Sequence, residues 1–266
     1  MNKHLLIYNI KSNLKMFIAF LAITLMYSTV AISMFDPETS EAMQQFIDVL
    51  PEAMINMMGF NSFGTELTGY LAAYLYGFIL FIFPMIFIVM LTSKLIAKQI
   101  DSTAIAYILT TPNSRKRIII TQAVSIIINI VSLVVINTLI VIVISWILFP
   151  GLLMIGKYIG LNLVLIGILL ITSSLVFIIS IAIDDYSKSI GLSSLLVGYL
   201  FIMNMTKNIS EELDFLKYTT FLSILNTDSI FNSPNYILVS TLFSIIISII
   251  LFFFGIIYFD KKNLTI

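Results

Sequence analysis

The chain has 266 residues, of which 59% are hydrophobic and only 11% are charged, whereas soluble domains carry about 25% charged residues. Basic and acidic residues balance at 14 each, so the sequence indicates no bulk attraction to nucleic acid. The absence of cysteine excludes disulfides, thiolate metal sites and thiol catalysis, and the single histidine, His4, excludes a multi-histidine metal site. We therefore expect no metal or cofactor on this chain. The composition predicts an all-α, polytopic membrane protein forming a single transmembrane domain over residues 1–266.

Long apolar runs recur along the whole chain, each close to the roughly 20 residues that a helix needs to cross a bilayer. Six transmembrane helices are predicted, at about residues 16–35, 70–91, 118–149, 158–183, 189–205 and 236–259. The third is long enough that it must tilt or protrude on the cytoplasmic side. Pro84 is expected to kink the second. None of the six carries a charged residue in its interior, which disfavours a proton-driven carrier and a voltage sensor.

Three segments outside the spans have amphipathic patterns. Residues 1–15 are basic and place apolar residues at helical spacing, which predicts an N-terminal interfacial helix, with a solvated basic tail as the alternative. Residues 36–69 carry only acidic charges and predict an external amphipathic helix, either a lid or a helix packed on the outer ends of the spans. Residues 206–235 allow one or two further short external helices.

The distribution of charge predicts the orientation. Six spans put both termini on one side, and placing them in the cytoplasm puts 11 of the 14 basic residues on the inner face. These are Lys3, Lys11, Lys15, Lys94, Lys98, Arg115, Lys116, Arg117, Lys188, Lys261 and Lys262. Because lysine and arginine bias sets membrane orientation, we predict a multi-pass protein of the cell membrane with both termini cytoplasmic.

Small and polar residues predict how the spans pack. Gly156 and Gly160 form a small-xxx-small pair, which favours close helix contact. Ser125, Asn129 and Ser132 share one face of the third span, where amides and hydroxyls usually join neighbouring helices by hydrogen bonds.

Two patterns resemble catalytic motifs without meeting their requirements. The stretch from Gly151 to Tyr158 has the glycines and lysine of a phosphate loop, but a tyrosine replaces the serine or threonine that binds magnesium, and no strand precedes it. Asp184 and Asp185 are adjacent at a span boundary, whereas a catalytic carboxylate pair needs two groups that face each other. A solvated loop is the ordinary explanation for this pair.

The segment from Lys94 to Arg117, here called the elbow, is a dense basic stretch between the second and third spans. Asp101 to Thr110 can form a short helix along the inner membrane face, ended by the Thr111-Pro112 break because proline disfavours helix at the residue before it. A helix in this place offers a soluble partner a surface on which to push.

The elbow resembles that of permeases of the type-2 ABC exporter family. Those permeases commonly carry, between their second and third spans, an acidic residue, a Gly-Thr-like pair, a leucine-rich stretch and then Pro-x-Ser-Arg. The same order is followed here by Asp101, Ser102-Thr103, Ile108-Leu109-Thr110 and Pro112-Asn113-Ser114-Arg115. The family often ends in a phenylalanine, basic residues and a leucine just past the sixth span, and Phe259, Lys261, Lys262 and Leu264 are similar.

The resemblance implies a transmembrane subunit of an ATP-driven exporter. Two such subunits, identical or paired with a paralogue, would assemble with two separate ABC ATPase subunits, which bind the ATP. The elbow would hold the coupling helix, and the segment from Asp184 to Lys188 a second, smaller contact. The residues expected at the ATPase contact are Asp101, Thr103, Tyr107, Leu109, Pro112, Arg115, Asp184 and Asp185. An uncharged bundle favours an amphipathic or lipid-like substrate such as a peptide, an antibiotic or a lipid.

The residues alone leave other functional classes possible. A passive channel or facilitator explains the missing charges equally well but gives the elbow helix no purpose. A structural, regulatory or immunity-type membrane subunit is a second alternative. A membrane enzyme has the weakest support, because the chain offers no credible cluster of acid, base and nucleophile.

Overall fold

The computed structural model describes residues 1–36, 49, 66–102, 114–206 and 211–262. Within these ranges every regular element is a helix, and six helical stretches are long and apolar enough to cross a membrane. They are α1 (Lys3–Ser33), the broken second span (Leu67–Asp101), α8 (Arg115–Leu148), α9 (Ile155–Ala182), α10 (Tyr186–Thr206) and α12 (Pro234–Lys261). The predicted all-α polytopic membrane fold is confirmed.

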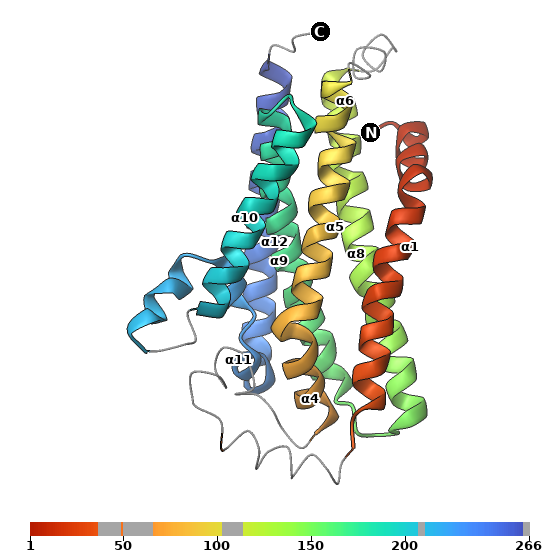
Figure 1. Cartoon of the computed structure of the whole chain (residues 1–266), viewed down its shortest axis with the longest axis vertical. Coiled ribbons are helices and arrows are strands. Elements are labelled where there is room, and N and C mark those ends of the chain that lie inside the picture. The colour runs from red at the N-terminus through yellow and green to blue at the C-terminus, as the bar shows by residue number, and fades with distance from the viewer. Residues whose placement is uncertain (37–48, 50–65, 103–113, 207–210, 263–266) are drawn as a thin grey trace.

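The long helices run roughly parallel, and the start of α1 and the end of α12 lie at the same end of the bundle (Figure 1). We call this end the termini face. It comprises the start of α1, the end of the second span, the start of α8, the end of α9, the start of α10 and the end of α12. The connection from α8 to α9 lies at the opposite end. The compartment that each end faces stays a prediction from the charge distribution.

The expected N-terminal interfacial helix is not a separate element. Residues 3–33 form one continuous helix, α1, so the basic segment extends the first span instead of lying flat at the membrane surface. Polar side chains in the basic segment explain why it continues the span. Asn9 and Asn13 are almost fully buried, and the Asn9 amide donates to Gln122 Oε1 at 2.7 Å and to Ser125 Oγ at 3.0 Å. The Asn9 side chain thus binds α1 to α8, while the Asn13 amide donates to the Asn9 carbonyl within α1 at 2.8 Å.

The second span contains a change of helix type. It consists of α4 (Leu67–Tyr74), a π-helical turn (Leu75–Ile79), α5 (Leu80–Leu95) and α6 (Ala97–Asp101). Pro84 lies inside α5, and a proline ring crowds the carbonyl four residues before it, here that of Leu80. The π-helical turn ends at Ile79, the residue before Leu80, so the irregularity expected at Pro84 lies more than one helical turn before the proline.

The third span is longer than the bilayer requires. With 34 residues, α8 is about 51 Å long at 1.5 Å per residue, against a hydrocarbon core of about 30 Å. It begins at Arg115 and not at Ile118, because the Ser114 hydroxyl caps the helix by accepting from the Arg117 amide at 3.3 Å. The extra turn carries the basic residues of the elbow onto the termini face.

The closest packing joins α9 to α12 and depends on glycines. A Cβ atom added at Gly160 would lie 2.6 Å from the Ile237 side chain, and one at Gly167 would lie 2.7 Å from Ser244 Cβ. No atom lies within 4 Å of the corresponding position at Gly156. The predicted small-residue contact is therefore confirmed at Gly160 and wrong at Gly156.

The opposite end is built from short elements. The segment before the sixth span forms two 3-10 helices (Glu211–Tyr218 and Phe221–Ile224) followed by α11 (Thr227–Asn232). Gly151 makes the turn between α8 and α9 at a φ of 82°, a backbone angle that favours glycine. The amphipathic helix expected within residues 36–69 lies almost wholly outside the described residues.

Candidate functional site

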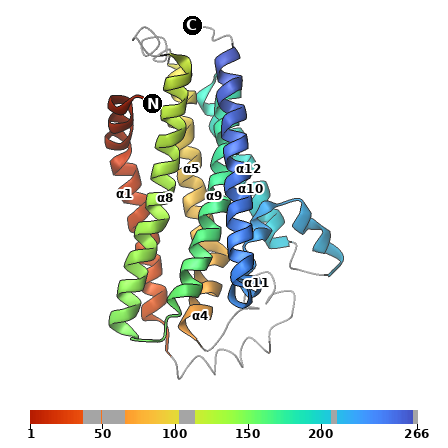
Figure 2. The ribbon, with the colours of Figure 1, turned by 180° about the vertical axis from the view of Figure 1, so that it is seen from behind.

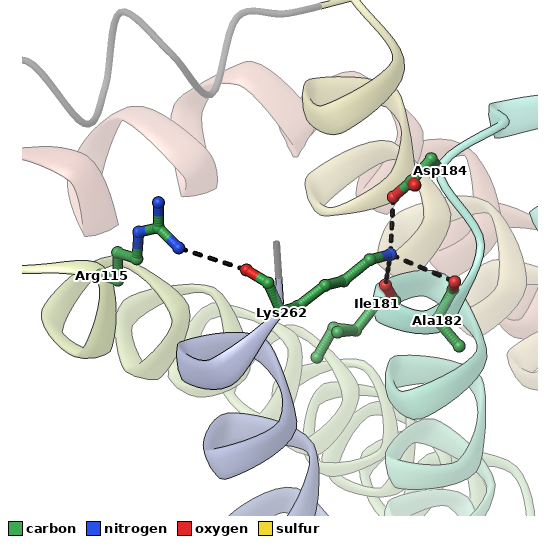
Figure 3. A network of polar contacts seen from close by, with 5 residues as sticks. All are labelled: Arg115, Ile181, Ala182, Asp184 and Lys262. Atoms are coloured by element: carbon green, nitrogen blue, oxygen red, sulfur yellow. Dashed lines mark hydrogen bonds and ion pairs between the residues drawn. The ribbon is translucent and has the colours of Figure 1, made fainter. Parts of the chain in front are cut away.

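The termini face brings together the two segments expected to contact a partner, which lie about 70 residues apart in the chain. Arg115 is the first residue of α8. One of its guanidinium nitrogens donates to the backbone carbonyl of Lys262 at 3.2 Å (Figure 3). Lys262 is the C-cap of α12, and a carbonyl at a helix end has no partner within its own helix. The arginine therefore caps α12 from the start of α8.

The side chain of Lys262 makes a second cap. Its ammonium donates to the carbonyls of Ile181 and Ala182, at 2.6 and 3.1 Å, and to Asp184 Oδ1 at 2.6 Å (Figure 3). Since α9 ends at Ala182, the two carbonyls belong to its last turn, where the helix dipole favours a cation. The side chain is only 11% exposed, and its three bonds match the three donors of an ammonium group.

The two adjacent aspartates have different partners. Asp184 pairs with Lys262, whereas Asp185 accepts from the Lys188 amide at 2.8 Å at the start of α10. Asp185 also lies 3.9 Å from the Lys188 ammonium, but both side chains are so exposed that this pair contributes little. Asp184 therefore helps Lys262 to hold the end of α9, and Asp185 caps the start of α10.

Further contacts bind both ends of the elbow to the bundle. At its start, the Lys98 ammonium lies 5.8 Å from the centre of the Tyr186 ring, which connects α6 to α10. At its end, Lys116 forms an ion pair with Asp260 at 3.3 Å, a second link from α8 to α12. Asp101 is the last residue of α6 and is exposed. The two ends of the elbow are thus attached to α10 and α12.

A buried amide network supports the same region from inside. Gln122 of α8 accepts from Asn9 of α1 and donates to Gln99 of α6 at 3.1 Å. The Lys94 ammonium donates to the Ser12 carbonyl at 3.4 Å. A movement of the first part of the elbow, which holds Lys94 and Gln99, would therefore be transmitted to α1 and to α8.

Four of the expected contact residues, Thr103, Tyr107, Leu109 and Pro112, lie outside the described residues. Of the others, Arg115 and Asp184 are joined through Lys262, while Asp101 and Asp185 occur separately on the same face. Sequence reasoning did not give Lys262 a contact role. The available signal was its place in the basic ending after Phe259, a residue that is fully buried.

The charged side chains of the termini face serve mainly as helix caps and ion-pair partners. Among the described residues no group of three or more metal-ligating side chains occurs. The charged groups are used to cap helix ends and to pair with one another, which holds the helix ends in a fixed relation and leaves Asp101, Lys116 and Asp185 at the surface.

A comparison of the sequence with known protein families found no match, and a comparison with curated proteins found none either. The likeness of the elbow to exporter permeases stays a prediction from its residues.

Proposed function

We propose that this chain is a transmembrane subunit of an ATP-driven ABC exporter. In this proposal two permease subunits, either two copies of this chain or this chain and a paralogue, bind two separate ATPase subunits on the termini face. That face is cytoplasmic, as the basic residues predict. The ATPases supply the energy, and the bundle moves an amphipathic or lipid-like substrate outward.

One observation supports this proposal more than any other. Arg115, at the exit of the elbow, and Asp184, in the loop before α10, belong to the two segments expected to contact an ATPase, and both bind Lys262. A partner that pressed on either segment would move the ends of α8, α9 and α12 together. Such coupling is what a transporter driven by an external ATPase needs, and a passive channel has no use for it.

The membrane interior agrees with an external source of energy. Outside α1, which carries Lys11 and Lys15 in its first half, the spans place their charged residues near the ends. The described polar groups at depth are amides and hydroxyls, such as those of Asn137, Asn162 and Ser28. Ion-coupled carriers commonly place ionisable side chains at membrane depth.

Purification of a tagged copy from its own host in mild detergent, followed by mass spectrometry, tests the proposal. We expect a stoichiometric soluble ATPase whose ATP hydrolysis depends on this subunit. A clean oligomer that brings no ATPase, also after crosslinking in cells, would overturn the proposal and favour a passive channel or a scaffold.

A matched pair of variants tests the contact itself. Arg115→Ala removes a group that binds the end of α12, and we expect it to reduce substrate-stimulated ATP hydrolysis while the protein still inserts in the membrane. Lys261→Ala, which removes an exposed lysine on the same face but outside both expected contact segments, is the control. Equal ATPase stimulation in both variants would remove Arg115 from the coupling contact.

A further inference from the structure

A groove between α1 and α8 contains a cavity of about 190 Å³. Figure 2 shows the two helices side by side along their length. The cavity walls are mainly apolar, formed by Ile10, Leu14 and Phe17 of α1 and by Ile128 and Ile136 of α8. Leu14 is 47% exposed and Ile128 is 36% exposed, so the groove is open to whatever surrounds the bundle. Such an open, mainly apolar groove suits a hydrocarbon chain.

Basic residues lie at the mouth of this groove on the termini face. Lys3 shares a face of α1 with Ile10 and Leu14, since the positions 3, 7, 10 and 14 follow helical spacing. On α8 the positions 117, 121, 125, 128 and 132 follow the same rule, which puts Arg117 on the groove side. Both basic side chains are exposed.

A chain of hydrogen bonds brings the two basic residues close together. The Asn2 amide, one residue before Lys3, donates to Thr121 Oγ1 at 2.9 Å. The same hydroxyl donates to the Arg117 carbonyl at 2.7 Å. Within the described part of the chain, no carboxylate forms an ion pair with Lys3 or Arg117. The backbones that carry Lys3 and Arg117 are thus linked through Thr121 at the end of the groove on the termini face.

We propose that the α1–α8 groove is a binding site for an anionic phospholipid, with its phosphate at Lys3 and Arg117 and one acyl chain in the cavity. The dimensions agree. At 1.5 Å per residue, the cavity residues of α1 lie about 10 to 21 Å below Lys3, and one leaflet of hydrocarbon is about 15 Å deep. Anionic lipids of a cytoplasmic leaflet are attracted by basic residues at the membrane surface.

A second copy of the chain is a weaker occupant of the groove. Two copies related by a twofold axis along the membrane normal would bring Lys3 and Arg117 toward the same residues of the partner. Like charges at that distance oppose the contact. A lipid phosphate supplies the opposite charge, and its acyl chain fills the groove below.

Native mass spectrometry of the purified full chain tests the proposal, with titrations of phosphatidylglycerol and phosphatidylcholine that carry the same acyl chains. We expect the anionic lipid to bind more tightly. Arg117→Gln and Lys3→Gln should each weaken phosphatidylglycerol binding roughly five-fold, because each basic residue near the surface contributes about 1 kcal/mol. Neither substitution should change phosphatidylcholine binding. Lys188→Gln, on the same face but on α10, is the control.

The acyl-chain half of the site has its own variant. Ser132→Phe fills the cavity and should abolish the high-affinity binding of phosphatidylglycerol, whereas Leu139→Phe adds the same ring to an exposed site on α8 and should not. If Ser132→Phe fails to fold, the charge variants still decide the proposal. Equal affinity of the wild type for both lipids would overturn it. So would a dimer that Ser132→Phe dissociates while lipid binding stays unchanged.

Discussion

Lys262 is the residue whose loss is expected to disturb the termini face most. Lys262→Met keeps the aliphatic stem and removes the ammonium group, so the Ile181 and Ala182 carbonyls and the Asp184 carboxylate lose their partner. A hydrogen bond to a charged group contributes about 1.5 to 3 kcal/mol to stability. Asp184 is 47% exposed and regains water, which places the expected loss near the lower end, at about 2 kcal/mol.

The assay is reversible denaturation in detergent, followed by the helical circular dichroism signal. Lys261→Met is the matched control, because its side chain is the exposed neighbour at the end of α12. Asp184→Asn should cost less than Lys262→Met, since the ammonium keeps its two carbonyl partners. The reasoning would be refuted if Lys262→Met were as stable as Lys261→Met, or if Asp184→Asn were the more damaging of the two.

Three further predictions address packing, the polar network and orientation. Gly167→Ile should destabilise the contact of α9 with α12 by about 1 to 3 kcal/mol through overpacking, whereas Gly156→Ile, with open space around it, should be nearly neutral in the same denaturation assay. Asn9→Leu should cost about 1 kcal/mol, the usual scale of an interhelical hydrogen bond in a membrane, and an unchanged midpoint would remove Asn9 from the network. In this cysteine-free chain, Asp36→Cys in intact cells should react with an impermeant maleimide and Asp101→Cys should not; the reverse pattern would invert the topology.

Hydropathy was sufficient to locate the spans, because the bilayer imposes a length on every apolar run. Hydropathy was less reliable at the ends of the spans, because hydrogen bonds determine where each helix begins and ends. The Ser114 hydroxyl starts α8 three residues before the apolar run. Asn9 looked like part of a surface helix because its sequence neighbours are basic, and only its pairing with Gln122, more than 100 residues away, shows that it faces another span.

The candidate site was predictable only in part for a similar reason. A family-like order of residues marked Arg115, and the short loop between the fourth and fifth spans marked Asp184, but no local pattern indicates that one lysine joins them. Lys262 lies about 80 residues from the carbonyls that it caps. The glycine contacts show the same limit: Gly156 and Gly160 are equivalent as a spacing motif, and only the position of Ile237 on α12 distinguishes them.

The capping of α9 by the end of α12 has a consequence for biogenesis. Membrane helices are synthesised in chain order, so α9 and α10 are made before α12 exists. During that interval the last carbonyls of α9 lack their lysine, and the glycine-lined side of α9 lacks the helix that covers it. The termini face therefore acquires its final form only after the sixth span has arrived. A partner that recognises this face in its finished geometry would select completed subunits over partly inserted ones.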